Sequence, residues 1–206
     1  MIYDPCIEVE SAKGIREISL ATRHLMNRNI FLQGEIDSDM ANTIISEFMY
    51  LSEDKDKAVN IFINSPGGEV NAGLMIYDII QDAKMPINLI CTGIAASMAA
   101  IILAGGQTDR RYLLPHSKVM IHEPLIAGGV GGSATSIKNI SESILETREI
   151  CNGILAKHAG KTLEEINKAT AFDNYMNAED AVKFGICDYI VSGITDKRIC
   201  NARSYS

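Results

Sequence analysis

The sequence predicts an α/β fold, in which β-strands and α-helices alternate along the chain. Three strand-then-helix pairs follow one another between about residues 29 and 104. Each strand is a short apolar run, and each following helix carries apolar residues at helical spacing. At 206 residues, and with about 150 residues per domain as a guide, the chain is predicted to form one domain, residues 1–206, with a substantial core.

The first strand–helix pair covers residues 29–51. The apolar run at residues 29–32 is the strand, and Ser38 is predicted to cap the helix that follows. The charged stretch at residues 52–57 ends that helix.

The next two pairs cover residues 59–104. Between the second strand and its helix, the segment Ser65-Pro66-Gly67-Gly68 is predicted to turn the chain. The third helix is short and almost entirely apolar, which predicts that it is buried. The predicted elements are strands at 59–63 and 87–91, and helices that begin at Asn71 and Ser97.

The second half of the chain contains a glycine-rich stretch and a long helix. Two strands, near residues 111–114 and 119–121, precede Gly128–Gly132. The helix from about Ala134 to His158 is longer than one small domain needs, and is therefore a candidate interaction element. A capping box at Thr162–Glu165, a short helix between Asn177 and Gly185, and a strand at 187–191 complete the pattern.

Composition argues against several classes of function. The formal net charge is −7 with scattered Lys and Arg, so no nucleic-acid partner is expected. The five Cys lack the spacing of a metal site, which predicts reduced thiols in the cytoplasm and no bound metal. We expect no signal peptide, because residues 1–5 lack a basic start and an apolar stretch, and no membrane span, because the longest apolar run is too short. No P-loop or dinucleotide motif is present, so no cofactor and no ATPase activity are expected.

The strongest indication of chemistry is Ser97, which lies in a run of small residues, with His122 downstream. A hydroxyl is a weak nucleophile that needs an imidazole within hydrogen-bond reach and a third group to fix the imidazole tautomer. At a strand-to-helix turn, Ser97 would also face a helix N-terminus, which favours a developing anion. The structural alternatives remain open: small residues permit close packing, and His122 can be a hydrogen-bonded residue at a strand end.

The other parts of such a site are less well determined. Gly67 and Gly68 can form only a turn, or they can let a substrate backbone approach and direct N–H groups outward. Spacing cannot select the acid among 26 acidic residues. Asp173, in a segment of mixed apolar and polar residues, is one candidate.

Several segments together resemble the ClpP family, the proteolytic subunits of Clp proteases, over about residues 14–191. The resemblance implies Ser97 as nucleophile, His122 as general base and then acid, and Asp173 as its orienting partner. It also implies an oxyanion hole from the N–H groups of Gly68 and Met98, and substrate contacts at Gly67, Glu69, Val70, Leu125 and Ile126. The matching segments are Ile30–Leu32, Ile63–Gly68, Ala95–Ala99, Leu114-Pro115, Val119–Pro124 and Asp173–Met176.

The resemblance also implies an architecture and partners. The family fold is a spiral of β-β-α units shared with the crotonases, with a protruding long helix at residues 125–160 for ring docking and an N-terminal axial segment at residues 1–20. Two heptameric rings, homomeric or mixed with a paralogue, would enclose the active sites. An AAA+ unfoldase ring, which binds the ATP, would feed unfolded polypeptide into them.

Four departures from the family pattern suggest a divergent paralogue. Phe172 replaces an Arg before the acid, residues 133–136 differ at the start of the long helix, Asn60 replaces a Tyr of the partner-docking pocket, and residues 17–22 replace a Tyr-rich segment. Two other functions remain open: a non-catalytic or weakly active ring subunit, and a crotonase-like acyl-CoA enzyme, which needs a backbone oxyanion hole but no triad.

Overall fold

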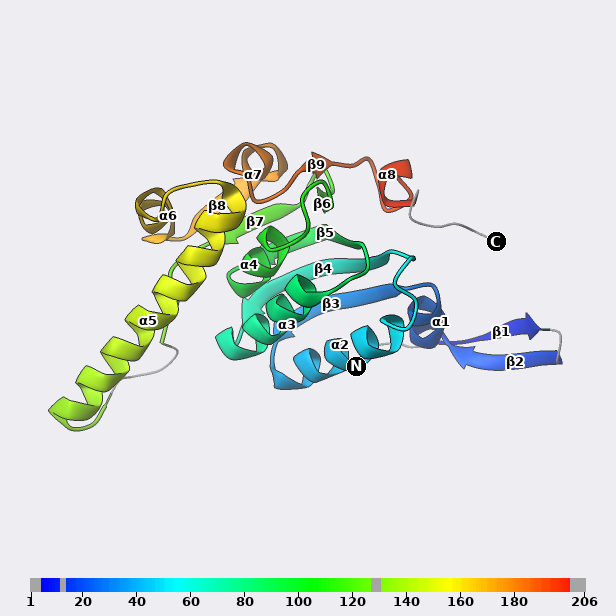
Figure 1. Cartoon of the computed structure of the whole chain (residues 1–206), viewed down its shortest axis with the longest axis horizontal. Helices are drawn as coiled ribbons and strands as arrows, with labels where there is room; N and C mark the ends of the chain where they lie inside the picture. Colours follow the sequence, from blue (N-terminus) through cyan, green and yellow to red (C-terminus); the bar gives the residue numbers. More distant parts are fainter. Residues whose placement is uncertain (1–4, 12–13, 127–130, 201–206) are drawn as a thin grey trace.

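A seven-stranded, mostly parallel sheet forms the centre of the computed structural model, which describes residues 5–11, 14–126 and 131–200 (Figure 1). The strand order is β3-β4-β5-β6-β9, and β7 pairs with both β5 and β8. Only the β7–β8 pair is antiparallel among these pairs. The predicted α/β class is therefore confirmed. The strands are β3 (Asn29–Ile36), β4 (Val59–Gly68), β5 (Ile87–Ala96), β6 (Arg111–Leu113), β7 (Lys118–Ile121), β8 (Asn174–Asn177) and β9 (Tyr189–Ile190).

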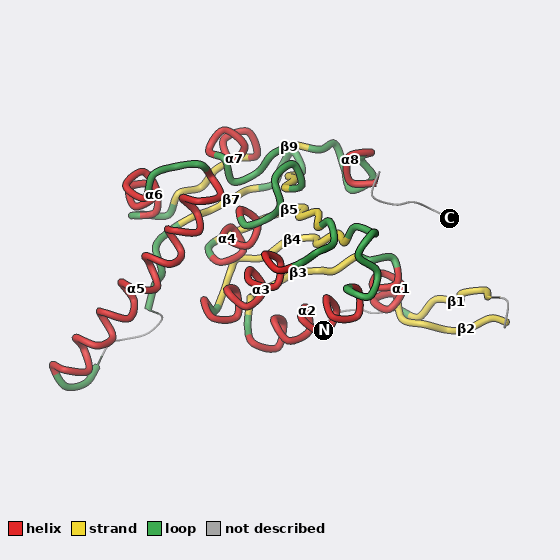
Figure 2. Tube along the Cα trace, viewed as in Figure 1, coloured by secondary structure: helices red, strands yellow, loops and turns green. Residues whose placement is uncertain are grey.

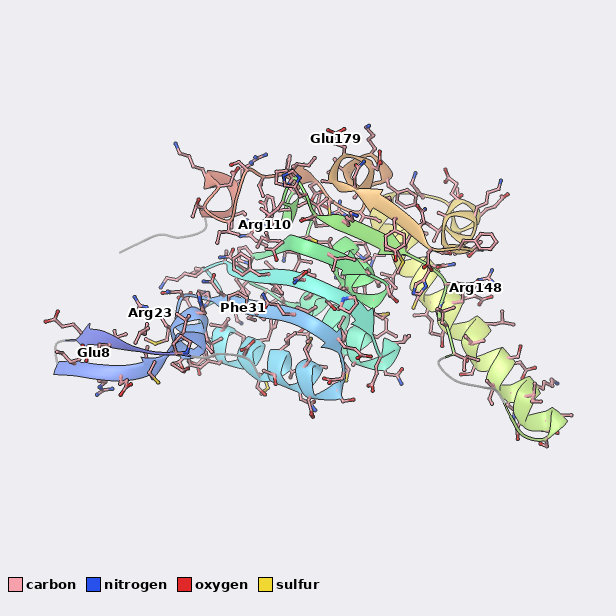
Figure 3. The ribbon with its side chains drawn as sticks, turned by 180° about the vertical axis from the view of Figure 1, so that it is seen from behind. Glu8, Arg23, Phe31, Arg110, Arg148 and Glu179 are labelled. Carbon is pink, nitrogen blue, oxygen red and sulfur yellow. The ribbon has the colours of Figure 1, made fainter. Side chains whose placement is uncertain are left out.

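Three helices cover one face of this sheet: α2 (Ser38–Leu51), α3 (Val70–Asp82) and α4 (Met98–Ala104) (Figure 1). Their apolar side chains and those of the strands form the main core. Side chains alternate across a strand, so Phe62 points to the other face, where it belongs to a smaller apolar cluster. Figure 3 shows this second face from behind, with Phe31 on β3, and Phe31 stacks on Phe62.

Other elements extend from the sheet, as Figure 2 shows for the hairpin at one end and the long helix at the other. Ser133 caps the long helix and Gly160, with φ 64°, ends it, so the predicted long helix is confirmed. No helix among the described residues has both the length and the apolar character needed to cross a bilayer. The remaining elements are β1 (Cys6–Ser11), β2 (Gly14–Ser19), α1 (Leu20–Met26), α5 (Ala134–Ala159), α6 (Leu163–Thr170), α7 (Ala178–Phe184) and α8 (Lys197–Cys200).

The predicted turn at residues 65–68 is wrong. Instead, β4 continues to Gly68, because Gly67 and Gly68 pair with Glu35 and Ile36 of β3. Their φ angles are 96° and 156°, and glycine adopts positive φ without a steric penalty. The two glycines thus bend the strand locally while its pairing continues.

Several boundaries also differ from the predicted ones. Asp37 caps α2 in place of Ser38, since its carboxylate accepts the N–H of Met40 at 2.8 Å. Helix α3 begins at Val70, one residue before the predicted start at Asn71. The sequence patterns did not indicate β1, β2, α1 or β8. Residues 128–130 of the predicted glycine-rich stretch lie outside the described residues.

A ladder of buried amides crosses three parallel strands and explains the environment of Asn60. Asn60 Nδ2 donates to Asn29 Oδ1 at 3.1 Å, and Asn88 Nδ2 donates to Asn60 Oδ1 at 2.9 Å. Arg110 closes the ladder with a bond of 2.9 Å to Asn88 Oδ1. Asn60 is therefore used in joining the strands, where each buried amide needs a partner.

Arg111 on β6 connects the ends of three helices. One guanidinium nitrogen donates to the carbonyls of Ala104, His158 and Gly185 at 3.0–3.2 Å. The remaining nitrogens bind the carboxylate of Asp188, and both side chains are largely shielded from water. A positive charge at the carboxyl ends of α4, α5 and α7 is also favoured by their dipoles.

We expect Arg111→Ala to lower the free energy of unfolding by about 3–5 kcal/mol, because it leaves a shielded carboxylate without its partner. The matched control is Lys84→Ala, which removes the exposed pair with Asp82 and should change stability by less than about 1 kcal/mol. Urea unfolding followed by circular dichroism measures both. Similar small losses in the two variants would contradict the structural role given to Arg111.

Candidate active site

Three strand ends meet where β7 lies between β5 and β8. Strand β5 ends one residue before Ser97, β7 ends one residue before His122, and β8 begins one residue after Asp173. Strand β7 runs parallel to the end of β5 and antiparallel to β8. This register brings the three predicted side chains to one edge of the sheet.

The contacts between these side chains differ in quality. Ser97 Oγ and His122 Nε2 are 2.9 Å apart and share a hydrogen bond. His122 Nδ1 and Asp173 Oδ1 are 3.3 Å apart, within ion-pair distance, but Nδ1 is buried and has no hydrogen-bond partner of good direction among the described residues. The Asp173 side chain is 58% exposed, against 14% for His122. Ser97 and His122 are therefore joined by a hydrogen bond, whereas Asp173 is close to His122 but not in a hydrogen-bonding direction.

Ser97 has a strained backbone, with φ 53° and ψ −123°. A positive φ is uncommon for a residue with a side chain and is often found at functional sites. The N–H of Ser97 donates to Met120 O at 2.8 Å, and its carbonyl accepts the N–H groups of Ala100 and Ile101. The sheet on one side and α4 on the other hold this turn, which directs the hydroxyl toward His122.

Gly67 and Gly68 lie where no side chain fits. A Cβ on Gly67 would lie 2.7 Å from the Cβ of Ser97, and one on Gly68 would overlap the carbonyl oxygen of Ile36. Ser65 Oγ accepts the N–H of Gly67 at 3.1 Å, so the buried Ser65 supports this strand end. Glycine is therefore required at Gly67 by close approach to Ser97, at Gly68 by close approach to the backbone of Ile36, and at both by positive φ.

The other predicted binding residues lie at the starts of α3 and α4 and after β7. Met98 is the first residue of α4, so its N–H has no acceptor within the helix. Glu69 precedes α3 and accepts a hydrogen bond from Ser38 Oγ at 3.2 Å. Val70, half-buried, begins that helix. Leu125 and Ile126, which follow β7, are exposed.

The thiols of the core do not offer a competing nucleophile. Burial raises the pKa of both Cys91 and Cys151 to about 11, and it raises the pKa of Cys187 well above its usual range. A thiol with such a pKa is protonated near neutral pH and unreactive. Among the described residues there is no disulfide and no group of three potential metal ligands.

Sequence patterns gave no sign of a buried polar contact that lies just before Asp173 in the chain. Asn152 on α5 and Thr170 at the end of α6 are both buried and bonded to each other. A polar residue within an amphipathic helix ordinarily indicates its solvent face, and for this reason Asn152 did not stand out.

We expect Gly67→Ala to slow the reaction of Ser97 with a fluorophosphonate by at least about tenfold, because the new Cβ must displace the nucleophile and adopt a strained φ. The control is Gly153→Ala on α5, where an added Cβ meets nothing within 4 Å and should stabilise the helix by about 0.5–1 kcal/mol. Labelling rates and melting temperatures are compared. An unchanged rate in Gly67→Ala would show that the close approach has no effect on Ser97.

A comparison with models of protein families finds a match to the model described as Clp protease over residues 12–193. The matched range includes the whole seven-stranded sheet and the three residues at its edge.

Proposed function

This chain belongs to the Clp protease family, and from that premise we propose that it is a serine endopeptidase that cleaves unfolded polypeptides inside an oligomer fed by an AAA+ unfoldase. The observation that supports this most is the 2.9 Å bond between Ser97 Oγ and His122 Nε2 on a strained turn. A serine hydroxyl next to a neutral imidazole can be deprotonated as it attacks, which is the requirement for acyl transfer.

In the proposed mechanism, Ser97 Oγ attacks the carbonyl carbon of the scissile peptide while its proton passes to His122 Nε2. Asp173 accepts a hydrogen bond from Nδ1–H and so fixes the tautomer. The N–H groups of Gly68 and Met98 stabilise the oxyanion of the tetrahedral intermediate. His122 then protonates the leaving amine, and in the second half it deprotonates the water that releases Ser97 from the acyl-enzyme.

The substrate would bind as an extended strand. The pairing of β4 with β5 ends at Ser65 and Ala95, so the last residues of β4 have no β5 partner on the side toward Ser97. Gly67, Glu69 and Val70 on this side would hold the peptide backbone, with Leu125 and Ile126 across from them, as β-strand addition does in other peptide sites. Backbone recognition of this kind suits substrates of varied sequence.

The surface of α5 supports ring docking. At 26 residues the helix is about 39 Å long, and it projects from the sheet (Figure 1). Exposed apolar side chains run along it, and Phe172 nearby in the fold is 85% exposed. These are side chains that a docking partner would cover. We propose two stacked heptamers, homomeric or mixed with a paralogue. The exposed apolar residues of α5 are Ile137, Ile140, Leu145 and Ile150.

A weakly active ring subunit is the second candidate, because Asp173 is exposed and not aligned with His122. Labelling with a fluorophosphonate separates the two, since a competent Ser97 reacts and an inert one does not. The same measurement separates the peptidase from an acyl-CoA enzyme of crotonase type, whose chemistry needs no activated serine.

We expect Ser97→Ala and His122→Ala each to reduce peptide hydrolysis by about 10⁴-fold to 10⁶-fold, as loss of a triad member does in other serine proteases, with the particle mass unchanged. Asp173→Asn should also slow turnover, because it favours the wrong imidazole tautomer. A fluorogenic peptide and light scattering give the two readouts. Activity retained in pure Ser97→Ala would contradict the assignment, and an unchanged rate in Asp173→Asn would mean that another group orients His122.

Docking through apolar side chains predicts a particle mass that changes little with salt, since screening weakens exposed charge pairs and not apolar contacts. Phe172→Ser should instead shift the mass toward single heptamers and reduce peptidase activity in proportion to the undocked fraction. The control is Ile15→Ser, an exposed apolar residue on the hairpin at the opposite side of the molecule. Steep dissociation with salt, or full activity in isolated heptamers, would contradict this docking model.

A further inference from the structure

A buried amide of α5 lies behind the segment that carries the acid. Asn152 is 1% exposed, and its Nδ2 donates to Thr170 Oγ1 at 3.1 Å and to Asn167 Oδ1 at 2.7 Å. Thr170 is the last residue of α6, three positions before Asp173. The amide therefore fixes the point from which the chain leaves α6 toward the acid.

Thr170 also contacts the segment of the base. Its carbonyl oxygen accepts the N–H of Glu123, the residue after His122, at 2.8 Å. Its hydroxyl donates to Ile166 O at 2.9 Å while accepting from Asn152. The Thr170 hydroxyl thus both donates and accepts a hydrogen bond inside the core, which holds it in one orientation.

A second contact from α5 is much weaker. One helical turn before Asn152, Arg148 lies 3.5 Å from the carboxylate of Glu123, with the two side chains 36% and 41% exposed; Figure 3 shows Arg148 on α5. Exposed pairs of this kind contribute about 0–1 kcal/mol. Leaving a buried hydrogen-bonding group without its partner costs about 1–3 kcal/mol. Of these two polar contacts between α5 and the site, the one through Asn152 is therefore the stronger.

The segment between Thr170 and β8 has little else to hold it. Phe172 is exposed, and so is Asp173. Asn174 Nδ2 bonds to Ala169 O at 3.1 Å, across the turn. The position of Asp173 therefore depends on the two ends of this short segment, of which one is held by β8 and the other by Thr170.

We propose that Asn152 is a positioning residue for the acid: through Thr170 it sets the distance and direction from Asp173 to His122. The proposal rests on the serine mechanism above. Because Asn152 belongs to α5, a displacement of that helix would reach Thr170 first and Asp173 next. The amide thereby couples the helix that we propose for docking to the alignment of the acid.

The test is a double-mutant cycle on the full chain. We expect Asn152→Ala to lower kcat for a fluorogenic peptide by at least about tenfold with KM nearly unchanged. In the Asp173→Asn background the same change should alter kcat by less than about twofold, because no carboxylate remains to be positioned.

Thr170→Val should lower kcat as Asn152→Ala does. Thr170→Ser, which keeps the hydroxyl, should retain the activity of the unmodified chain. Asn139→Ala, an exposed asparagine on the same helix, is the control.

Loss by the same factor in both backgrounds would overturn the proposal, since a general loss of folded protein acts equally on each. A lower melting temperature with unchanged kcat would also overturn it. If Asn152→Ala does not fold, the Thr170→Val and Thr170→Ser pair carries the same test alone. Activity retained in Ser97→Ala would show that the serine mechanism is wrong and would overturn both proposals. If Ser97 is essential but the effects of Asn152→Ala and Asp173→Asn are additive, only the positioning role is overturned.

Discussion

The register of β7 against two neighbours is the constraint on which the site depends. Only four residues long, β7 must pair with β5 on one side and β8 on the other, and a slip of one residue would turn His122 to the opposite face. The register is fixed at the point along β5 where its pairing with β6 ends and its pairing with β7 begins. There Cys91 O accepts both the N–H of Leu114 and the hydroxyl of Ser117, at 3.0 and 2.8 Å. Because Ser117 is buried, this junction is held within the core.

Ser97 is followed by a buried helix, whereas Asp173 lies on an exposed segment. The turn at Ser97 stores about 1–3 kcal/mol of strain, but the seven residues of α4 that follow are all buried, and full burial of each large side chain contributes about 1.5–3 kcal/mol. Burial of α4 is therefore large enough to offset the strain at Ser97. The segment of Asp173 has no comparable burial. The serine and histidine are set by folding of the single chain, whereas the acid depends on few contacts.

Much of the fold follows from sequence patterns, and the failures have physical reasons. Apolar spacing indicated α2 and α3 because each packs one face against the sheet, and the continuous apolar run of α4 indicated a helix that is buried all round. The strand through Gly67 and Gly68 was missed because glycine fits a turn and a bent strand equally well. Strand β8 is short and carries an exposed Tyr175, so it shows little alternation. Ser97 and His122 could be paired from the local sequence, but Asp173 came only from family resemblance, and Asn152 not at all.

The unaligned Asp173, the exposed Phe172 and the exposed apolar residues of α5 lie on segments that contact one another. The acid is not aligned, Phe172 beside it is exposed, and α5, bonded to the same segment through Asn152, carries uncovered apolar residues. Covering Phe172 and α5 by a second ring would add contacts to the exposed segment that carries Asp173. Linkage is reciprocal: if docking favours the aligned acid by some factor, then a bound group that requires the aligned acid favours docking by the same factor. An acylated or transition-state-like adduct at Ser97 would therefore strengthen ring docking without touching the docking surface.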